Sequence, residues 1–512
     1  MNVFKKVIQT IIIVAIIALL VVVLVLSCVP KQKKSDVELV KLADIHIPEK
    51  LDQDNLFGLF FFDENGVPTP VKDGVDKVCY DKNKPTIIFI HGMQMNYGYH
   101  RYDPIANADG IVKAGYNFGV FFWSQLADCG MPGVGKKKIW GRTSGNFFYA
   151  DENDNRVEEA DDVLKYATSE VFVAYYLDFM EKAGCDGSSV TITGHSLGAN
   201  TLFAVTSYMT TLYKEGLITK EFLPDRFTYL DAYMDALVDK DTYVPWLKHT
   251  IGEEGVIGLA KEAVAAAREL GIATEYVKSC QLVSFLSDTL IYGGVEGTSK
   301  SLFDKMLYLD FSCAFAAKAN FLNMFGDEHC ASMNYALRSV GEITPKDVSD
   351  PNGEALAFNL NTPISYSYAR NGAIYRMETN KTEFNFDDDV FYSENISCAK
   401  IAGFAFNDAN DNGINDDRVK NRVGGVTVKL YDEGGNFVAE TKTSEGGYYE
   451  FNLKQTDVGK SFTVRAELDG GKFGKTSDGG YMNNGVNAQG VSAKLRINSA
   501  IDLKIVNIGI NK

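Results

Sequence analysis

The chain has 512 residues, of which 46% are hydrophobic and 23% charged, an ordinary balance for globular protein. This length predicts two or three domains rather than a single core. The formal net charge is −16, and no basic stripe interrupts the acidic surplus. Binding to nucleic acid requires such a stripe, so no nucleic acid is expected among the partners.

The first 28 residues have the pattern of an export signal or a membrane anchor. Lys5 and Lys6 precede an apolar run over 11–26, and Ser27-Cys28 follows it. This resembles a bacterial lipoprotein signal, in which Cys28 becomes the acylated N-terminus. The run is long for such a signal, so an uncleaved membrane helix is the alternative. Both interpretations tether the protein to a membrane, and we expect its bulk outside the cytoplasm, at the bacterial cell membrane or surface.

Residues 29–50 read as a polar tether, and the cysteines beyond it indicate no cofactor. Seven cysteines follow Cys28, an odd number that argues against a complete disulfide framework. The most plausible pair is Cys313 with Cys330. No CxxC pair or His/Cys cluster indicates zinc.

Residues 51–345 alternate short apolar strands with helical patterns, which is typical of an α/β domain with a mostly parallel sheet. Strands are expected at 86–90, 118–123, 190–193, 227–230 and 282–286, and helices at 170–182, 199–213 and 258–270. Residues 346–398 lose this rhythm and read as a β-rich connector. Residues 399–512 have short alternating strands with many Gly, Asn and Asp turns, which predicts a small all-β sandwich.

A serine between two glycines stands where a predicted strand becomes a predicted helix. The stretch reads VTITGHSLGAN, with Ser196 flanked by Gly194 and Gly198. A serine on a strained strand-to-helix turn presents its hydroxyl at the sheet edge, and the small neighbours let the backbone pass close by. Ser196 is therefore the predicted nucleophile, and an inert tight turn is the alternative.

A second stretch, KPTIIFIHGM over 84–93, is a buried-type strand that ends in His91-Gly92. Acyl transfer needs two amide donors aimed at the developing oxyanion. We expect these donors to be the backbone N–H groups of Leu197 and Met93. His91 is expected to shape the turn rather than to act as a base.

The order of HGM, GVFFWSQ, GHSLGA, YLDAYM and DEHCASMNYALRS resembles the α/β-hydrolase superfamily, and within it lipases of the pancreatic lipase type. The resemblance covers roughly residues 84–340. It implies a triad of serine, aspartate and a late histidine, an acyl-enzyme, and carboxylic esters such as lipids as substrates, with no cofactor for catalysis. Peptidases, thioesterases and acyltransferases share this constellation.

The base and the acid come from chain order, since both follow the serine in this superfamily. Of six histidines, His249 and His329 lie well beyond Ser196, and only His329 follows the last of the five strands expected in the α/β domain. We expect His329 to be the base and His249 to be a surface or cap residue. The resemblance to the pancreatic type assigns Asp231 as the acid. Asp288 is the choice in most other members of the superfamily, and Asp235 is a further alternative.

Two segments, 131–145 and 246–280, are candidates for a lid or cap over the substrate, with inert surface loops as the equal alternative. A different reading of the whole chain is a non-catalytic surface binding or adhesion protein built on a retired hydrolase scaffold. The presence of every expected triad member favours the enzyme.

The sandwich region opens with NDANDNGINDD, in which oxygen-bearing side chains alternate around a glycine. Such a loop suits a hard cation, with a solvated polar turn as the alternative. The region resembles the B-type module of serine-aspartate repeat surface adhesins, a prealbumin-like sandwich. That resemblance implies a structural Ca²⁺ held by Asp408, Asn410, Asn412 and either Asp416 or Asp417.

Overall fold

The computed structural model describes the chain in pieces. The described residues are 35–46, 56–93, 108–127, 137–142, 147–150, 153, 155–159, 165–184, 190–234, 240–253, 255–278, 307–310, 346–347, 373–378, 390–393, 399–414, 421–476, 484–498 and 503–511. Residues 35–38 belong to a first unit, Met1–Glu38, and all the others to a second, Leu39–Lys512. Within these ranges no helix is long and apolar enough to cross a membrane. The predicted leader and the Cys313–Cys330 pair lie outside them.

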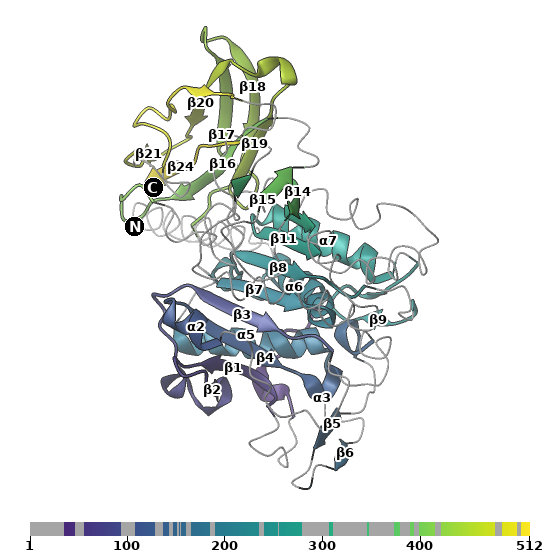
Figure 1. Cartoon of the computed structure of the whole chain (residues 1–512). Coiled ribbons are helices and arrows are strands. Elements are labelled where there is room, and N and C mark those ends of the chain that lie inside the picture. Colours follow the sequence, from purple (N-terminus) through teal and green to yellow (C-terminus); the bar gives the residue numbers. More distant parts are fainter. Residues whose placement is uncertain are drawn as a thin grey trace, which may run out of the picture. The chain divides into compact units, whose positions relative to one another are not determined.

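One large sheet organises the first domain (Figure 1). Among the described residues it has eleven strands in the order β13-β15-β14-β12-β11-β8-β7-β3-β4-β1-β2. Its parallel centre is formed by β4 (Asn117–Phe122), β3 (Thr86–Ile90), β7 (Val190–His195), β8 (Arg226–Leu230), β11 (Ala273–Lys278), β12 (Leu307–Asp310) and β14 (Ala373–Glu378). At one flank, β1 (Gly58–Phe62) pairs antiparallel with β4 and with β2 (Pro68–Pro70). At the other, β15 (Val390–Ser393) pairs antiparallel with β14 and parallel with β13 (Lys346–Asp347).

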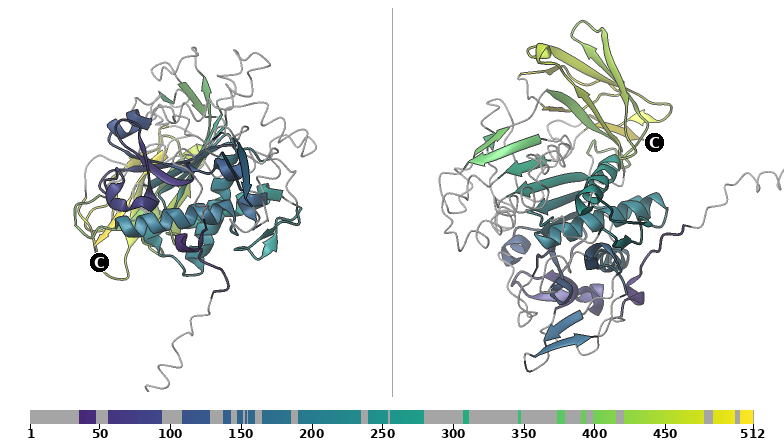
Figure 2. Two further views of the ribbon diagram at one scale, coloured as in Figure 1. Left: turned by 90° about the horizontal axis from the view of Figure 1, so that it is seen from below. Right: turned by 90° about the vertical axis from the view of Figure 1, so that its right-hand side faces the viewer.

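Helices cover the sheet, which is why its strands are apolar runs rather than alternating patterns. α5 (Thr168–Ala183), α6 (Leu197–Lys214) and α7 (Gly255–Glu269) pack side by side, and α6 lies on β7 and β8. α2 (Ala108–Lys113) packs on β4 and β1. The crossover through α2 runs across the sheet in the opposite direction from those through α6 and α7. Right-handed crossovers therefore place α2 on the opposite face (Figure 2).

The expected strands and helices up to residue 270 are confirmed, with bounds that differ by at most three residues. The expected strand at 282–286 lies outside the described residues, and the strand that follows α7 is β11, at Ala273–Lys278. The sequence of β11 does not show the apolar run of a buried strand, because it contains Thr274 and Glu275, polar residues that are fully buried. Glu275 accepts a hydrogen bond from the Thr228 hydroxyl over 3.0 Å and lies 3.7 Å from the Arg226 guanidinium. These two partners lower the free-energy cost of burying the Glu275 carboxyl group.

The stretch predicted as a connector contributes to the same sheet, since β14 pairs with β12 and β15 pairs with β14. In the described part of the first domain, two hairpins lie outside the large sheet: β5 (Phe147–Ala150) with β6 (Arg156–Glu159), and β9 (Tyr243–Val244) with β10 (His249–Thr250). A short helix, α3 (Ser124–Ala127), follows β4.

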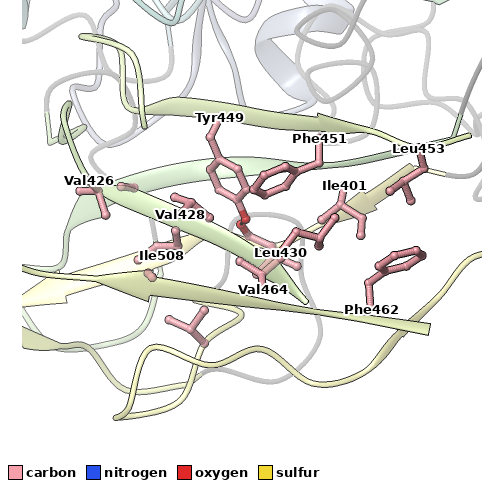
Figure 3. Close-up of a cluster of buried hydrophobic side chains, with 14 of the residues drawn as sticks. Ile401, Val426, Val428, Leu430, Tyr449, Phe451, Leu453, Phe462, Val464 and Ile508 are labelled. Atoms are coloured by element: carbon pink, nitrogen blue, oxygen red, sulfur yellow. Dashed lines mark hydrogen bonds between the residues drawn. The ribbon is translucent and has the colours of Figure 1, made fainter. Parts of the chain in front are cut away.

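The C-terminal region is an all-β sandwich, as predicted. One sheet joins β19 (Tyr448–Asn452), β16 (Lys400–Asn407), β23 (Leu503–Ile505), β24 (Ile508–Asn511) and β21 (Lys472–Phe473). The other joins β18 (Phe437–Lys442), β17 (Thr427–Asp432), β20 (Ser461–Glu467) and β22 (Leu495–Arg496). Between them, Tyr449 and Phe451 of β19 face Leu430 and Val464 of the other sheet (Figure 3). Alternate positions point inward, as the pleat of a strand requires.

Candidate active site

Ser196 stands at the junction between β7, which ends at His195, and α6, which begins at Leu197. Its backbone has φ 57° and ψ −122°, a region that residues with a side chain rarely adopt. The strand-to-helix turn predicted from the sequence is therefore present, with its strain at the serine. Strain of this kind is retained where the surroundings hold it, often at a functional site.

The two flanking glycines are required by close backbone contacts. A Cβ on Gly194 would lie 2.4 Å from the Gly198 carbonyl oxygen, and a Cβ on Gly198 would lie 2.2 Å from the Ile90 carbonyl oxygen. Both distances are far inside van der Waals contact, so no larger residue fits without moving the main chain. The glycines let the start of α6 lie directly on the end of β3.

The turn after β3 lies against the serine. A Cβ on Gly92 would lie 3.0 Å from the Ser196 Cβ, so Met93 follows a residue in contact with the candidate nucleophile. The N–H of Leu197 is the first of α6, where backbone donors have no partner within the helix and the dipole favours negative charge. Met93 and Leu197 are thus on the two segments that meet at Ser196. Their role as oxyanion donors stays a prediction.

His91 is held as a neutral, structural imidazole. Its Nδ1 lies 2.7 Å from the Gly92 carbonyl oxygen and donates to it, and burial lowers the pKa of the imidazole from 6.5 to about 4. Near neutral pH the ring is neutral, and its other nitrogen, Nε2, accepts the Trp123 backbone N–H over 3.0 Å, so neither nitrogen is free to act as a base. The geometry agrees with the expectation that His91 shapes the turn.

Asp231 follows β8 immediately, on the strand beside the nucleophile strand. Its side chain is buried and its backbone has φ 41°, so it is the second strained residue at this edge of the sheet. The Ser196 N–H donates to the Leu230 carbonyl over 3.0 Å, and the Tyr233 N–H donates to the Ser196 carbonyl over 3.2 Å. These bonds bring the segment that carries Asp231 against the segment that carries Ser196.

The remaining candidates for the triad are placed differently. His249 is exposed on β10, as expected of a surface residue, and its Nδ1 lies 2.7 Å from the Thr250 carbonyl oxygen. His329, Asp288 and Asp235 lie outside the described residues. The assignment of His329 as the base and the choice of Asp231 over its alternatives therefore stay predictions.

The structure corrects the candidate lids in part. Within 131–145 the described residues 137–142 are anchored: Trp140 is fully buried, and Arg142 binds the buried Glu170 through two hydrogen bonds of 2.9 and 2.7 Å. Within 246–280, α7 is a crossover helix and β11 a central strand, so that interpretation was wrong there. The sequence signal was the helical period of α7, which also suits a packed crossover.

In the C-terminal domain, the described part of the predicted cation loop is a turn closed by its own oxygens. Asp408 is buried, and its two carboxylate oxygens accept the N–H groups of Asn412 and Gly413 over 3.0 and 2.9 Å. The Asn412 side chain accepts the Ile414 N–H over 2.8 Å. The donor set has the hard oxygens that Ca²⁺ prefers, and each oxygen keeps a second lone pair.

Two observations count against a set of calcium ligands in this loop. Lys475 lies 3.2 Å from Asp411, placing positive charge beside the loop. Among the described residues no three acidic, histidine or cysteine side chains come together to hold a metal. Asp416 and Asp417 lie outside those residues, so calcium stays a prediction.

The strand order and the strained serine turn define the class of the first domain, an α/β-hydrolase-type fold. The second domain matches a known family: residues 399–509 match the model of the SdrD B-like domain. No curated protein matches the chain.

Several solved structures resemble parts of the chain at low identity. They include a Mycobacterium tuberculosis puromycin-hydrolyzing peptidase, 15% identical over 46% of this chain and 31% of that one, with a TM-score of 0.25. An acylaminoacyl peptidase from Pyrococcus horikoshii is 13% identical over 50% and 37%, with a TM-score of 0.27. A hormone-sensitive lipase from a metagenome library is 12% identical over 60% and 92%, with a TM-score of 0.26. The chain thus spans about a third of each peptidase, and these scores are too low to carry any conclusion about activity.

Proposed function

We propose that the protein is a serine hydrolase that cleaves carboxylic esters through an acyl-enzyme. The observation that carries the proposal is the strained Ser196 turn, with Gly194 and Gly198 in backbone contact and the His91-Gly92 turn against the serine. Asp231, also buried and strained, follows the adjacent strand. An inert tight turn would not require backbone strain at both Ser196 and Asp231, whereas such strain is common at functional sites.

The proposed chemistry uses three side chains. His329 takes the proton of the Ser196 hydroxyl as its oxygen attacks the ester carbonyl, and Asp231 fixes the imidazole tautomer and stabilises its charged form. The oxyanion is held by the N–H groups of Leu197 and Met93. The tetrahedral intermediate collapses, the alcohol leaves with the proton from His329, and the acyl group stays on Ser196. Water, activated by His329, then releases the acid.

The proposed location is outside the cytoplasm, tethered to the bacterial membrane or cell surface. The SdrD B-like domain at 399–509 supports this, together with the resemblance of this region to the B-type module of surface adhesins. The basic and apolar start of the sequence, with Cys28 after it, supports a lipid or helical anchor. A lipid or another ester at the cell envelope is then an accessible substrate.

A fluorophosphonate probe tests the proposal directly, since it reacts with an activated serine. We expect the folded protein to be labelled, the Ser196→Ala variant to remain unlabelled, and p-nitrophenyl esters of rising chain length to be hydrolysed. A folded wild-type protein that is neither labelled nor active on this panel would overturn the enzyme and favour a binding protein on a retired scaffold.

A further inference from the structure

Asn200 joins three segments at the candidate site. It is fully buried on α6, four residues after Ser196. Its Nδ2 donates to the Tyr233 carbonyl over 3.0 Å, and its Oδ1 accepts the Trp140 indole N–H over 2.9 Å. An indole N–H can only donate and a carbonyl can only accept, so these partners fix the orientation of the amide.

The bond to Tyr233 is one of three hydrogen bonds that hold the turn carrying Asp231. Leu230 accepts the Ser196 N–H, and Tyr233 donates its N–H to the Ser196 carbonyl. Asp231 lies between these two attachment points, with its φ of 41°. The Asn200 side chain supplies the third attachment of the same turn. A strained residue persists only where its surroundings over-determine it, which is what three attachments within four residues accomplish.

The Asn200 side-chain oxygen is bound by Trp140, whose indole ring is packed against that of Trp246. Trp140 is fully buried and stacks on Trp246, with ring centroids 6.1 Å apart and planes inclined by 26°. The Trp246 indole N–H donates to the Ser207 hydroxyl over 3.0 Å. The acceptor side of the amide is therefore bound to a group that cannot swing away, and the donor side stays directed at Tyr233.

We propose that Asn200 is a positioning residue: it holds the turn that carries Asp231 in register with Ser196. This inference rests on the proposed function. Asn200 does not touch the reacting atoms in this scheme and acts only through the acid. Loss of its donor lets the strained turn relax, which moves the carboxylate relative to the base. Displacements of about 1 Å can cost on the order of 100-fold in rate.

The test compares Asn200→Leu with Thr206→Val. Asn200→Leu keeps the approximate size and adds no charge, but it removes the donor to the Tyr233 carbonyl and the acceptor for Trp140. Thr206→Val is the matched control, because Thr206 lies on the same helix and also makes buried hydrogen bonds, to Leu202 and Tyr229, away from the turn. If Asn200→Leu does not fold, Asn200→Ser, neutral and smaller, is measured by the same criteria.

For the Asn200 variant we expect kcat to fall on the order of 10- to 100-fold with KM within about twofold. The acidic limb of the pH profile should move to lower pH, because a displaced carboxylate stabilises the charged base less. Thr206→Val should keep the wild-type pH limb and KM. An Asn200 variant with wild-type kcat and pH limb, in a protein whose wild type is labelled by fluorophosphonate, overturns this inference alone. An unlabelled wild type overturns the proposed function instead.

Discussion

The Trp123 backbone N–H donates to Nε2 of His91 over 3.0 Å, and the Trp123 indole N–H donates to the His91 carbonyl over 2.9 Å. These two bonds join the end of β4 to the turn beside Ser196. The first of them requires an unprotonated Nε2, so it is lost when the ring takes up a second proton. His91 therefore couples the geometry of this turn to its own neutral state.

The stability of the domain should fall in acid through His91. Its pKa is about 4 in the folded protein and near 6.5 when unfolded, so the unfolded chain takes up the proton first as pH falls. We expect a loss of roughly 2 kcal/mol in the free energy of unfolding between pH 7 and pH 5 from this group. Denaturant unfolding followed by tryptophan fluorescence measures it.

The matched variants are His91→Gln and His249→Gln. The first removes the buried titrating group and should reduce the loss of stability between pH 7 and pH 5, whereas the second removes an exposed histidine and should leave that loss unchanged. Equal losses in the wild type and in His91→Gln would contradict the assignment.

Gly198→Ala should destabilise the domain and disable the serine. The added methyl would meet the Ile90 and His91 carbonyl oxygens at 2.2 and 2.3 Å, so main-chain segments must separate. We expect a loss of about 3 kcal/mol and slower fluorophosphonate labelling of the fraction that remains folded. Gly470→Ala is the control, because no atom lies within 4 Å of the new methyl. If both alanines have the same small effect on unfolding, the close approach does not constrain the turn.

Asp231→Asn should give a folded but nearly inactive protein. Losing the orienting carboxylate leaves the serine and the oxyanion donors in place and the imidazole in the wrong tautomer, a loss on the order of 10⁴-fold in kcat for a serine triad. Asp288→Asn should keep most of its turnover. Ester hydrolysis by the two purified variants decides between them, and the reverse result would assign the acid to Asp288.

Chelation should destabilise the SdrD B-like domain alone, because a cation that binds only the folded form adds stability by mass action. All three tryptophans, Trp123, Trp140 and Trp246, lie outside that domain. In the full chain, EDTA should lower the melting temperature seen by far-ultraviolet circular dichroism but not that seen by tryptophan fluorescence. Ester hydrolysis should not change. Melting curves indifferent to both EDTA and added Ca²⁺ would make Asp408–Asp417 a solvated polar turn.

The sequence by itself determined the features that depend on near neighbours. The apolar runs of β3, β7 and β8 and the helical period of α5 and α6 are local patterns, because a buried strand or helix face must be apolar at fixed spacing. The strand-to-helix turn at Ser196 was predictable for the same reason, since five consecutive residues specify it. The Gly, Asn and Asp turns of the sandwich are equally local.

Only the tertiary structure decided the features that depend on distant partners. β11 was missed because Glu275 reads as exposed, until Thr228 and Arg226 of the adjacent strand are placed beside it. Asn200 carried no signal either, since its partners Trp140 and Tyr233 lie 60 and 33 residues away along the chain. A polar side chain becomes tolerable in a core only when its hydrogen bonds are satisfied there, and that pairing is a property of the folded chain, not of any local pattern.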